Sequence, residues 1–134
     1  MAVIALTAAK IARVFPEKDL VFDFIAAAAI TAGQAVYINS AGKVDLADAS
    51  VAGTSRAVGI ALNAAGAGQA VSVLMRGHIA GFTLSGMAYD AIAYVSDTTG
   101  SLDDAAGTVS VAVGRVFPLS DKSLTKVLYV DFEV

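Results

Sequence analysis

Apolar and polar positions alternate along most of the chain, which is the period of a β-strand with one buried face. In residues 19–25, Leu20, Phe22 and Phe24 share one face, and aspartates lie on the other. Strands are expected at residues 19–25, 34–38, 44–47, 56–62, 69–76, 77–84, 91–96, 108–117 and 126–134. No convincing helix separates them. The pattern therefore predicts an all-β fold, a β-sandwich or β-tulip-like barrel built of antiparallel hairpins.

The first residues do not share this clear alternation. We expect residues 1–18 to form an N-terminal arm or edge strand and residues 19–134 to form a single β domain. The alanines of residues 2–14 would also support a short helix, although an extended arm or strand is favoured. Apolar patterning at the chain ends suggests that residues 1–16 or the last strand reach a neighbouring subunit.

Two parts of the chain resemble each other. Residues 35–45 and 92–103 each contain a strand, a turn with glycine and a returning strand. Residues 57–62 and 112–117 follow them, and both begin with Ala-Val-Gly. We interpret this as two similar hairpin units around a shared core.

The amino-acid composition limits the kinds of partner that the chain is expected to bind. Hydrophobic residues make up 57% of the 134 positions and charged residues 16%, the net charge is -3, and cysteine is absent. Nucleic-acid binding requires a basic face, and none is visible. The most apolar stretch, residues 24–38, is too short to span a bilayer, and residues 1–6 lack the preceding positive charges of a signal peptide. We expect a soluble, unprocessed protein that binds no nucleic acid or membrane and whose excess apolar surface is covered by protein partners.

Candidate catalytic groups are few. The chain has one histidine, His78, which we interpret as a strand-end residue that is hydrogen-bonded or lies at an interface. Residues 81–86 do not form the Gly-x-Ser-x-Gly turn of a nucleophilic serine. The glycines of residues 65–69 precede neither a helix nor Gly-Lys-Ser/Thr, so they are interpreted as hairpin glycines rather than a phosphate cradle.

Aspartates are the usual protein ligands of calcium, and aromatic residues such as tyrosine line sugar-binding clefts. The aspartates fall in corresponding turns of the two hairpin units: Asp45, Asp48, Asp97, Asp103 and Asp104. They lack the spacing of an EF-hand and are interpreted as solvated turn carboxylates. The tyrosines are scattered and are expected in or beside the core: Tyr37, Tyr89, Tyr94 and Tyr129. The sequence thus predicts no enzyme, with no catalytic, cofactor-binding or metal residues and no cofactor.

Three strings carry a family resemblance. They are Ala-Ile-Thr-Ala-Gly-Gln-Ala-Val-Tyr-Ile at residues 29–38, Arg-Ala-Val-Gly-Ile-Ala at 56–61 and Val-Ser-Val-Leu-Met-Arg-Gly at 71–77. In this order and spacing, the chain from residue 26 to residue 117 resembles the small capsid decoration (cement) proteins of tailed bacteriophages.

The resemblance implies a β-sandwich or β-tulip-like structural subunit, a homotrimer with a dimer as the alternative. Its partners would be copies of itself and the major capsid protein. It would bind the outer surface of the expanded head in the virion and clamp neighbouring capsid subunits. The alternative is another virion structural subunit, such as a head-fibre base, tail or minor coat protein. A carbohydrate-binding module is disfavoured by the absence of tryptophan, and a small hydrolase by the missing motifs.

Overall fold

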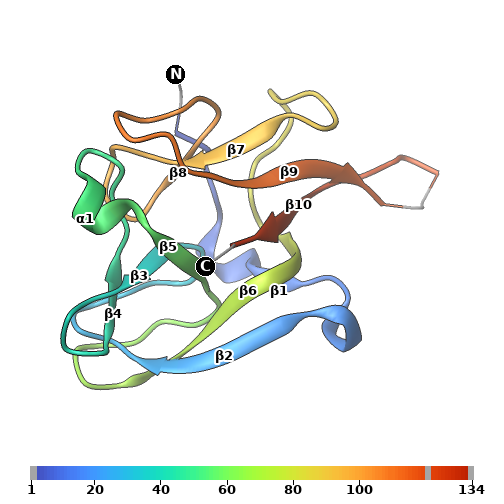
Figure 1. The fold of residues 1–134 in the computed structure, drawn as a ribbon. Helices are drawn as coiled ribbons and strands as arrows, with labels where there is room; N and C mark the ends of the chain where they lie inside the picture. Colours follow the sequence, from blue (N-terminus) through green and yellow to red (C-terminus); the bar gives the residue numbers. More distant parts are fainter. Residues whose placement is uncertain (1–2, 120–121, 133–134) are drawn as a thin grey trace.

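A computed structural model describes residues 3–119 and 122–132. These residues form an antiparallel sheet that curls into a half-barrel, which confirms the all-β prediction (Figure 1). The strands run β4-β3-β5-β6-β10-β9-β7-β8, and β1 and β2 also pair with β6. Their bounds are β1 (Ala12–Arg13), β2 (Leu20–Ile25), β3 (Ala35–Ile38), β4 (Val44–Leu46), β5 (Ala57–Ala61), β6 (Ala70–Ala80), β7 (Ile92–Val95), β8 (Leu102–Asp103), β9 (Ala112–Pro118) and β10 (Lys126–Asp131).

The main differences from the predicted elements lie around glycines and short turns. Strand β6 runs through Gly77 without a break and ends before Gly81, whose φ of 107° suits glycine. Residues 77–84 therefore do not form a separate strand. The small-residue loop after β4 contains one helical turn, α1 (Ala52–Ser55), and the returning strand expected within residues 92–103 is the two-residue strand β8.

The two expected hairpin units are present and have the same pairing. In the first, β3 pairs with β4 and β5, and in the second, β7 pairs with β8 and β9. The register of the second pairing shifts at the same place in both units, after Val36 and after Ala93. Because β5 and β9 then pair with β6 and β10, the sheet order has the same pattern from either end.

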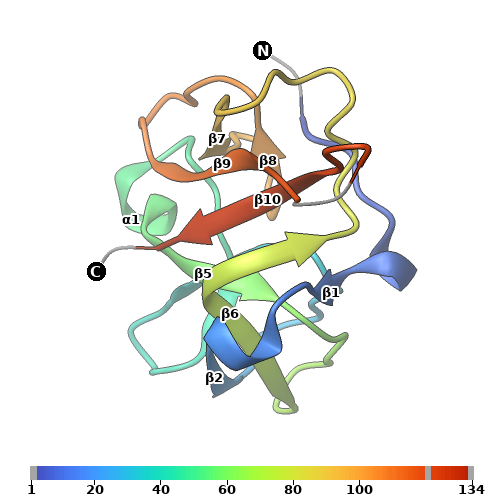
Figure 2. The same ribbon diagram turned by 90° about the vertical axis from the view of Figure 1, so that its right-hand side faces the viewer.

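An approximate twofold axis relates the two units and passes between β6 and β10. The pair Ile60–Leu74 corresponds to Arg115–Tyr129, an offset of 55 positions in both strands. By the same offset Arg76 corresponds to Asp131, and these two residues face each other across the antiparallel β6–β10 pair. Figure 2 shows the two strands side by side and running in opposite directions.

The shared Ala-Val-Gly string has a steric explanation. A Cβ atom on Gly59 would overlap the carbonyl oxygen of Leu74, and one on Gly114 would overlap that of Tyr129. Leu74 and Tyr129 are themselves equivalent under the offset. Both units therefore require glycine because a neighbouring backbone approaches closely at this point.

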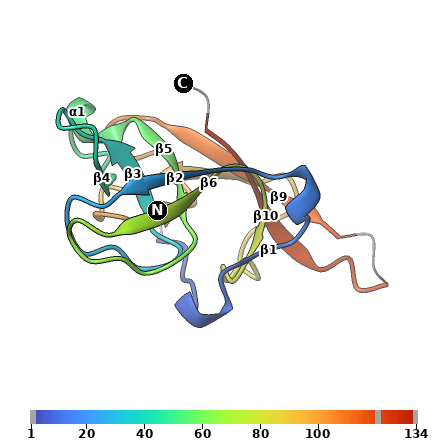
Figure 3. The ribbon, with the colours of Figure 1, turned by 90° about the horizontal axis from the view of Figure 1, so that it is seen from below.

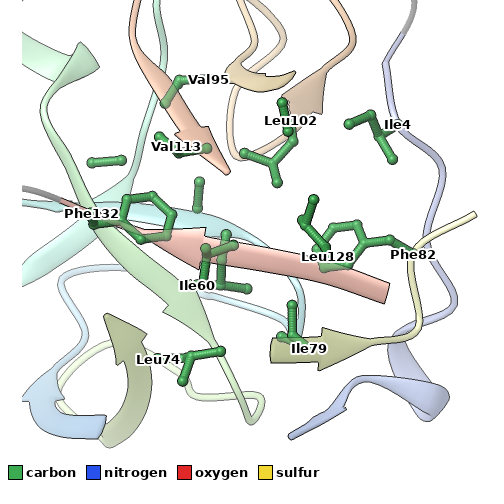
Figure 4. Packing of buried hydrophobic residues seen from close by; sticks show 14 of the residues in the cluster. Ile4, Ile60, Leu74, Ile79, Phe82, Val95, Leu102, Val113, Leu128 and Phe132 are labelled. Atoms are coloured by element: carbon green, nitrogen blue, oxygen red, sulfur yellow. The ribbon is translucent and has the colours of Figure 1, made fainter. Parts of the chain in front are cut away.

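Two cores lie on opposite faces of the central strands. On the β5–β6 ladder, Ile60 and Leu74 point into the larger core, which Figure 4 shows. Their neighbours Ala61 and Val73 point into the smaller core. Strand β5 is consequently buried at every position. Its alternate residues face two different cores, and neither face of the strand is exposed to water.

The N-terminal segment packs on its own chain. Ile4 is 5% exposed in the larger core, and its amide donates to the Leu102 carbonyl at 2.8 Å. After a single 3₁₀ turn, Ala8–Lys10, strand β1 pairs with the end of β6. Within residues 3–16 the chain is thus mostly extended. The expectation that this segment reaches a neighbour is corrected for Ile4, because the core buries it.

Candidate interaction surfaces

His78 lies within β6, directly opposite Tyr129 of β10. Its ring centroid is 5.0 Å from that of Tyr129, 5.3 Å from Phe117 and 5.2 Å from Phe15. Burial lowers the pKa of His78, and the Asp19 carboxylate opposes this shift. The histidine is therefore surrounded mainly by aromatic rings, which is the environment of a packed or interfacial residue.

These four side chains form one cluster, which we call the aromatic face: Phe15, His78, Phe117 and Tyr129. All four are partly exposed, and Phe117 and Tyr129 stack at 4.9 Å. The guanidinium of Arg115 lies 5.7 Å from the Phe117 ring centre. Aromatic side chains beside arginine are the residues most enriched where protein partners bind tightly.

Asp19 lies under this face. Its side chain has no exposed area, and its carboxylate makes no hydrogen bond of good geometry among the described residues, although the backbone N–H of His78 faces it and lowers its pKa. The oxygens pack over Gly77, where a Cβ atom would overlap them. Burial raises the pKa of Asp19, and the Arg13 guanidinium, 3.9 Å away, offsets only part of that effect. A raised pKa in the folded state predicts that the ionised carboxylate is less favourable here than in water.

Two exposed ion pairs flank the aromatic face. Arg76 Nε lies 3.3 Å from Asp131 Oδ1, and Arg115 Nε lies 3.2 Å from Asp90 Oδ1. Because solvent screens both pairs, each contributes little to stability, at most about 1 kcal/mol. Their positions instead give the rim of the aromatic face a mixed, polar character, as protein-binding patches have.

The acidic turns bind their own backbone. Asp48 accepts from the Ser50 amide and from Thr99 Oγ1, each at 2.8 Å, and the hydrogen bonds from these two residues lower its pKa. Asp103 accepts from the Ala105 amide at 3.2 Å and from a serine hydroxyl, and it is only 2% exposed. The prediction of solvated carboxylates is wrong for Asp103, because β8 packs into the core. No group of three or more possible metal ligands occurs among the described residues.

A shallow groove lies near the starts of β5 and β9. Two adjoining hollows of about 390 and 420 Å³ share Ala57 and Val111 as lining residues. One also contains Tyr129 and Phe132, and the other contains Arg56. Neither lining contains serine, cysteine or histidine, the residues of the common Ser–His and Cys–His catalytic pairs.

A third surface is the outer side of β2, which we call the β2 edge (residues 20–25). Among the described strands β2 forms a ladder only with β6, and it runs alongside β6 on the underside of the molecule (Figure 3). Directly after β2, Ala26 is bridged to Val44 of β4. Leu20, Phe22 and Ile25 are 49%, 58% and 43% exposed. The alternation predicted one buried face for this strand. Because β2 lies at the edge of the sheet, these apolar side chains are instead about half exposed.

The sequence did not predict the aromatic face. Tyr129 was expected in or beside the core but lies on the outer face of the sheet, and Tyr89 is 46% exposed. His78, Phe117 and Tyr129 come together only through the β6–β10–β9 register. Alternation within each strand does give the side on which a residue lies. The sequence pattern does not reveal which strands are neighbours in the sheet, and this pairing is what brings the aromatic residues together.

Comparison with known proteins gave no match: neither family models nor curated proteins nor solved structures match this chain. Among the described residues, no helix has the length and apolar character needed to cross a membrane. The surfaces above therefore carry the functional argument.

Proposed function

We propose that this chain is a structural capsid decoration protein of a tailed bacteriophage. It binds the outside of the expanded head and clamps neighbouring major capsid subunits. It acts without catalysis or cofactors, and its partners are the major capsid protein and copies of itself. The observation that carries the proposal is the presence of two separate adhesive surfaces on a single β body, the aromatic face and the β2 edge.

A clamp needs a rigid body and at least two contact surfaces. Rigidity follows from the two buried cores and the continuous sheet. The aromatic face, rimmed by Arg76 and Arg115, has the composition of a protein-binding hot spot, and we assign it to the capsid protein. A subunit that binds only the expanded lattice stabilises that lattice by mass action.

The proposal is tested by mixing the purified protein with expanded heads that lack it and with unexpanded heads, then pelleting both. We expect binding in hundreds of copies per expanded head and none to unexpanded heads. Tyr129→Ala should weaken binding at least tenfold. Tyr89→Ala removes an exposed aromatic side chain that is not one of the four residues of the aromatic face, and it should change binding little. Absence of binding to expanded heads at micromolar concentration would refute the proposal, and a few copies per particle would indicate a minor virion subunit instead.

A further inference from the structure

The β2 edge has few of the features that normally protect an exposed strand: a register shift between Leu20 and Val21, one aspartate, and β4 beside its C-terminal end. Edge strands of soluble proteins usually carry lysine or proline, or are very short, because open backbone groups bind other strands. Strand β2 has six residues, Leu-Val-Phe-Asp-Phe-Ile, with one charged side chain. Its exposed apolar side chains lie on both sides of the strand, since Phe22 and Ile25 point to opposite faces. A strand added edge-on covers both sides, whereas a flat protein surface would cover one.

The hydrogen bonds around the end of β2 identify the free backbone groups. Ala26 donates toward β6, to the Gln69 carbonyl at 2.9 Å. Ala27 donates in the opposite direction, to the Val44 carbonyl at 2.8 Å. Successive residues of a strand direct these groups to alternate sides. Val21, Asp23 and Ile25 therefore direct their N–H and C=O groups away from β6. The bridge between Ala26 and Val44 places β4 beside Ile25, so Val21 and Asp23 are the residues at the free edge.

We infer that β2 pairs antiparallel with β2 of a second copy across a twofold axis, with Phe22 opposite the second copy's Phe22. Hydrogen bonding across the axis requires the outward-facing residues of both strands to be aligned, which restricts the register. One allowed register places Asp23 opposite the second copy's Asp23, and another places Asp19 opposite it. Both of these registers place two negative charges opposite each other, which is unfavourable. The third register with a long overlap places Asp23 opposite Val21 of the second copy and avoids this repulsion.

The side chains fit this register. Leu20, Phe22 and Phe24 share a face, and the Phe22 and Phe24 rings are already 5.1 Å apart. Phe22 lies on the axis, where Leu20 meets the second copy's Phe24, so six apolar side chains form one continuous strip. Phe22 occupies a non-hydrogen-bonded pair, the position where opposite side chains approach most closely. The strand is thus complementary to itself, which is why the occupant is a second copy.

This inference rests on the proposed function, which includes binding to copies of itself. It specifies a dimer rather than a trimer. Its register is directly testable because the chain contains no cysteine. In Phe22→Cys the Cα atoms of the two cysteines would lie about 4.5 Å apart, which is within the Cα–Cα range of disulfides. Mild oxidation should convert most of this variant to a covalent dimer. Leu124→Cys, at a 51% exposed loop position, should remain monomeric on a denaturing gel. Equal cross-linking of the two variants would overturn the register.

Sedimentation equilibrium then tests the surface itself. The wild type and Leu124→Lys should be dimers at micromolar concentration, and Phe22→Lys should be a monomer with unchanged circular dichroism. A monomeric or trimeric wild type, or a Phe22→Lys variant that stays dimeric, would overturn the inference. A dimer that ignores expanded heads would refute the proposed function alone. If the wild type bound expanded heads but had the same sedimentation mass as Phe22→Lys, the β2 pairing alone would be refuted.

Discussion

At the scale of single residues, the two equivalent glycines are the most constrained positions of the sheet. Ala at Gly59 or Gly114 would place a Cβ atom on a carbonyl oxygen of the neighbouring strand, and backbone cannot move aside as a side-chain tip can. We expect Gly59→Ala and Gly114→Ala each to lower the free energy of unfolding by roughly 1–3 kcal/mol or more. Denaturant titration measures this. Gly53→Ala, in the open turn α1, is the control and should be neutral or slightly stabilising.

Asp19 gives a pH-dependent expectation at the same scale. Its pKa is raised in the folded state, so the fold loses stability as the pH rises from the ordinary aspartate value through the raised one. Asp19→Asn removes this effect. The variant should melt at a higher temperature than the wild type at pH 7, and the difference should shrink below about pH 4.

Asp48 is the natural control because its pKa shifts in the opposite direction. Asp48→Asn should therefore lower the melting temperature at pH 7, with the loss disappearing in acid. An Asp19→Asn variant that is less stable than the wild type at neutral pH would show that the Arg13 ion pair outweighs the burial of the carboxylate.

At the scale of elements, the sequence located most strands to within a few residues because alternation depends only on local burial. It could not separate burial against one core from burial between two, so β5 and β2 looked alike although one is central and the other is an edge. The repeated Ala-Val-Gly string was more informative. It carried a tertiary constraint, the close backbone approach at Gly59 and Gly114, and thereby revealed the two units.

The N-terminal segment is the element whose interpretation changed most. Residues 3–6 close the second unit, with Val3 bridged to Asp103 and Leu6 to Phe82. We expect Ile4→Ala to cost about 2–5 kcal/mol of folding free energy, since it opens a cavity in the larger core. Val3→Ala, at a 45% exposed position, is the control and should change stability little in the same chemical denaturation. Equal, small effects of both variants would mean that the segment is dispensable for folding.

At the scale of the whole molecule, the approximate twofold axis has one chemical marker. Arg76 and Asp131 are equivalent positions that meet on the axis and form an ion pair there. Arginine or aspartate at both positions would place two like charges together, so an ion pair on the axis requires the two halves to differ there. The flanking surfaces differ as well, because β2 extends only the first unit and Phe15 packs on His78 of β6 beside the axis. One half therefore presents the β2 edge, and the axis region presents the aromatic face.

This division gives a whole-molecule expectation that links the two proposals. A dimer joined at the β2 edge offers two aromatic faces to the capsid lattice, and binding of the first raises the effective concentration of the second. Phe22→Lys, a monomer, should bind expanded heads 10²- to 10⁴-fold more weakly than the wild type, roughly the usual range for lost avidity, although its aromatic face is intact. Tyr129→Ala should weaken binding by a different route, since it stays dimeric but damages both faces.

Binding isotherms on expanded heads, combined with sedimentation of the free protein, separate these routes. Joining two Phe22→Lys subunits by a flexible linker should restore much of the lost affinity, whereas the same linker cannot rescue Tyr129→Ala, because each face remains weak. If Phe22→Lys bound as tightly as the wild type, the two surfaces would act independently. Subunits would then bind the lattice singly through their aromatic faces, and the β2 edge would contribute nothing to the clamp.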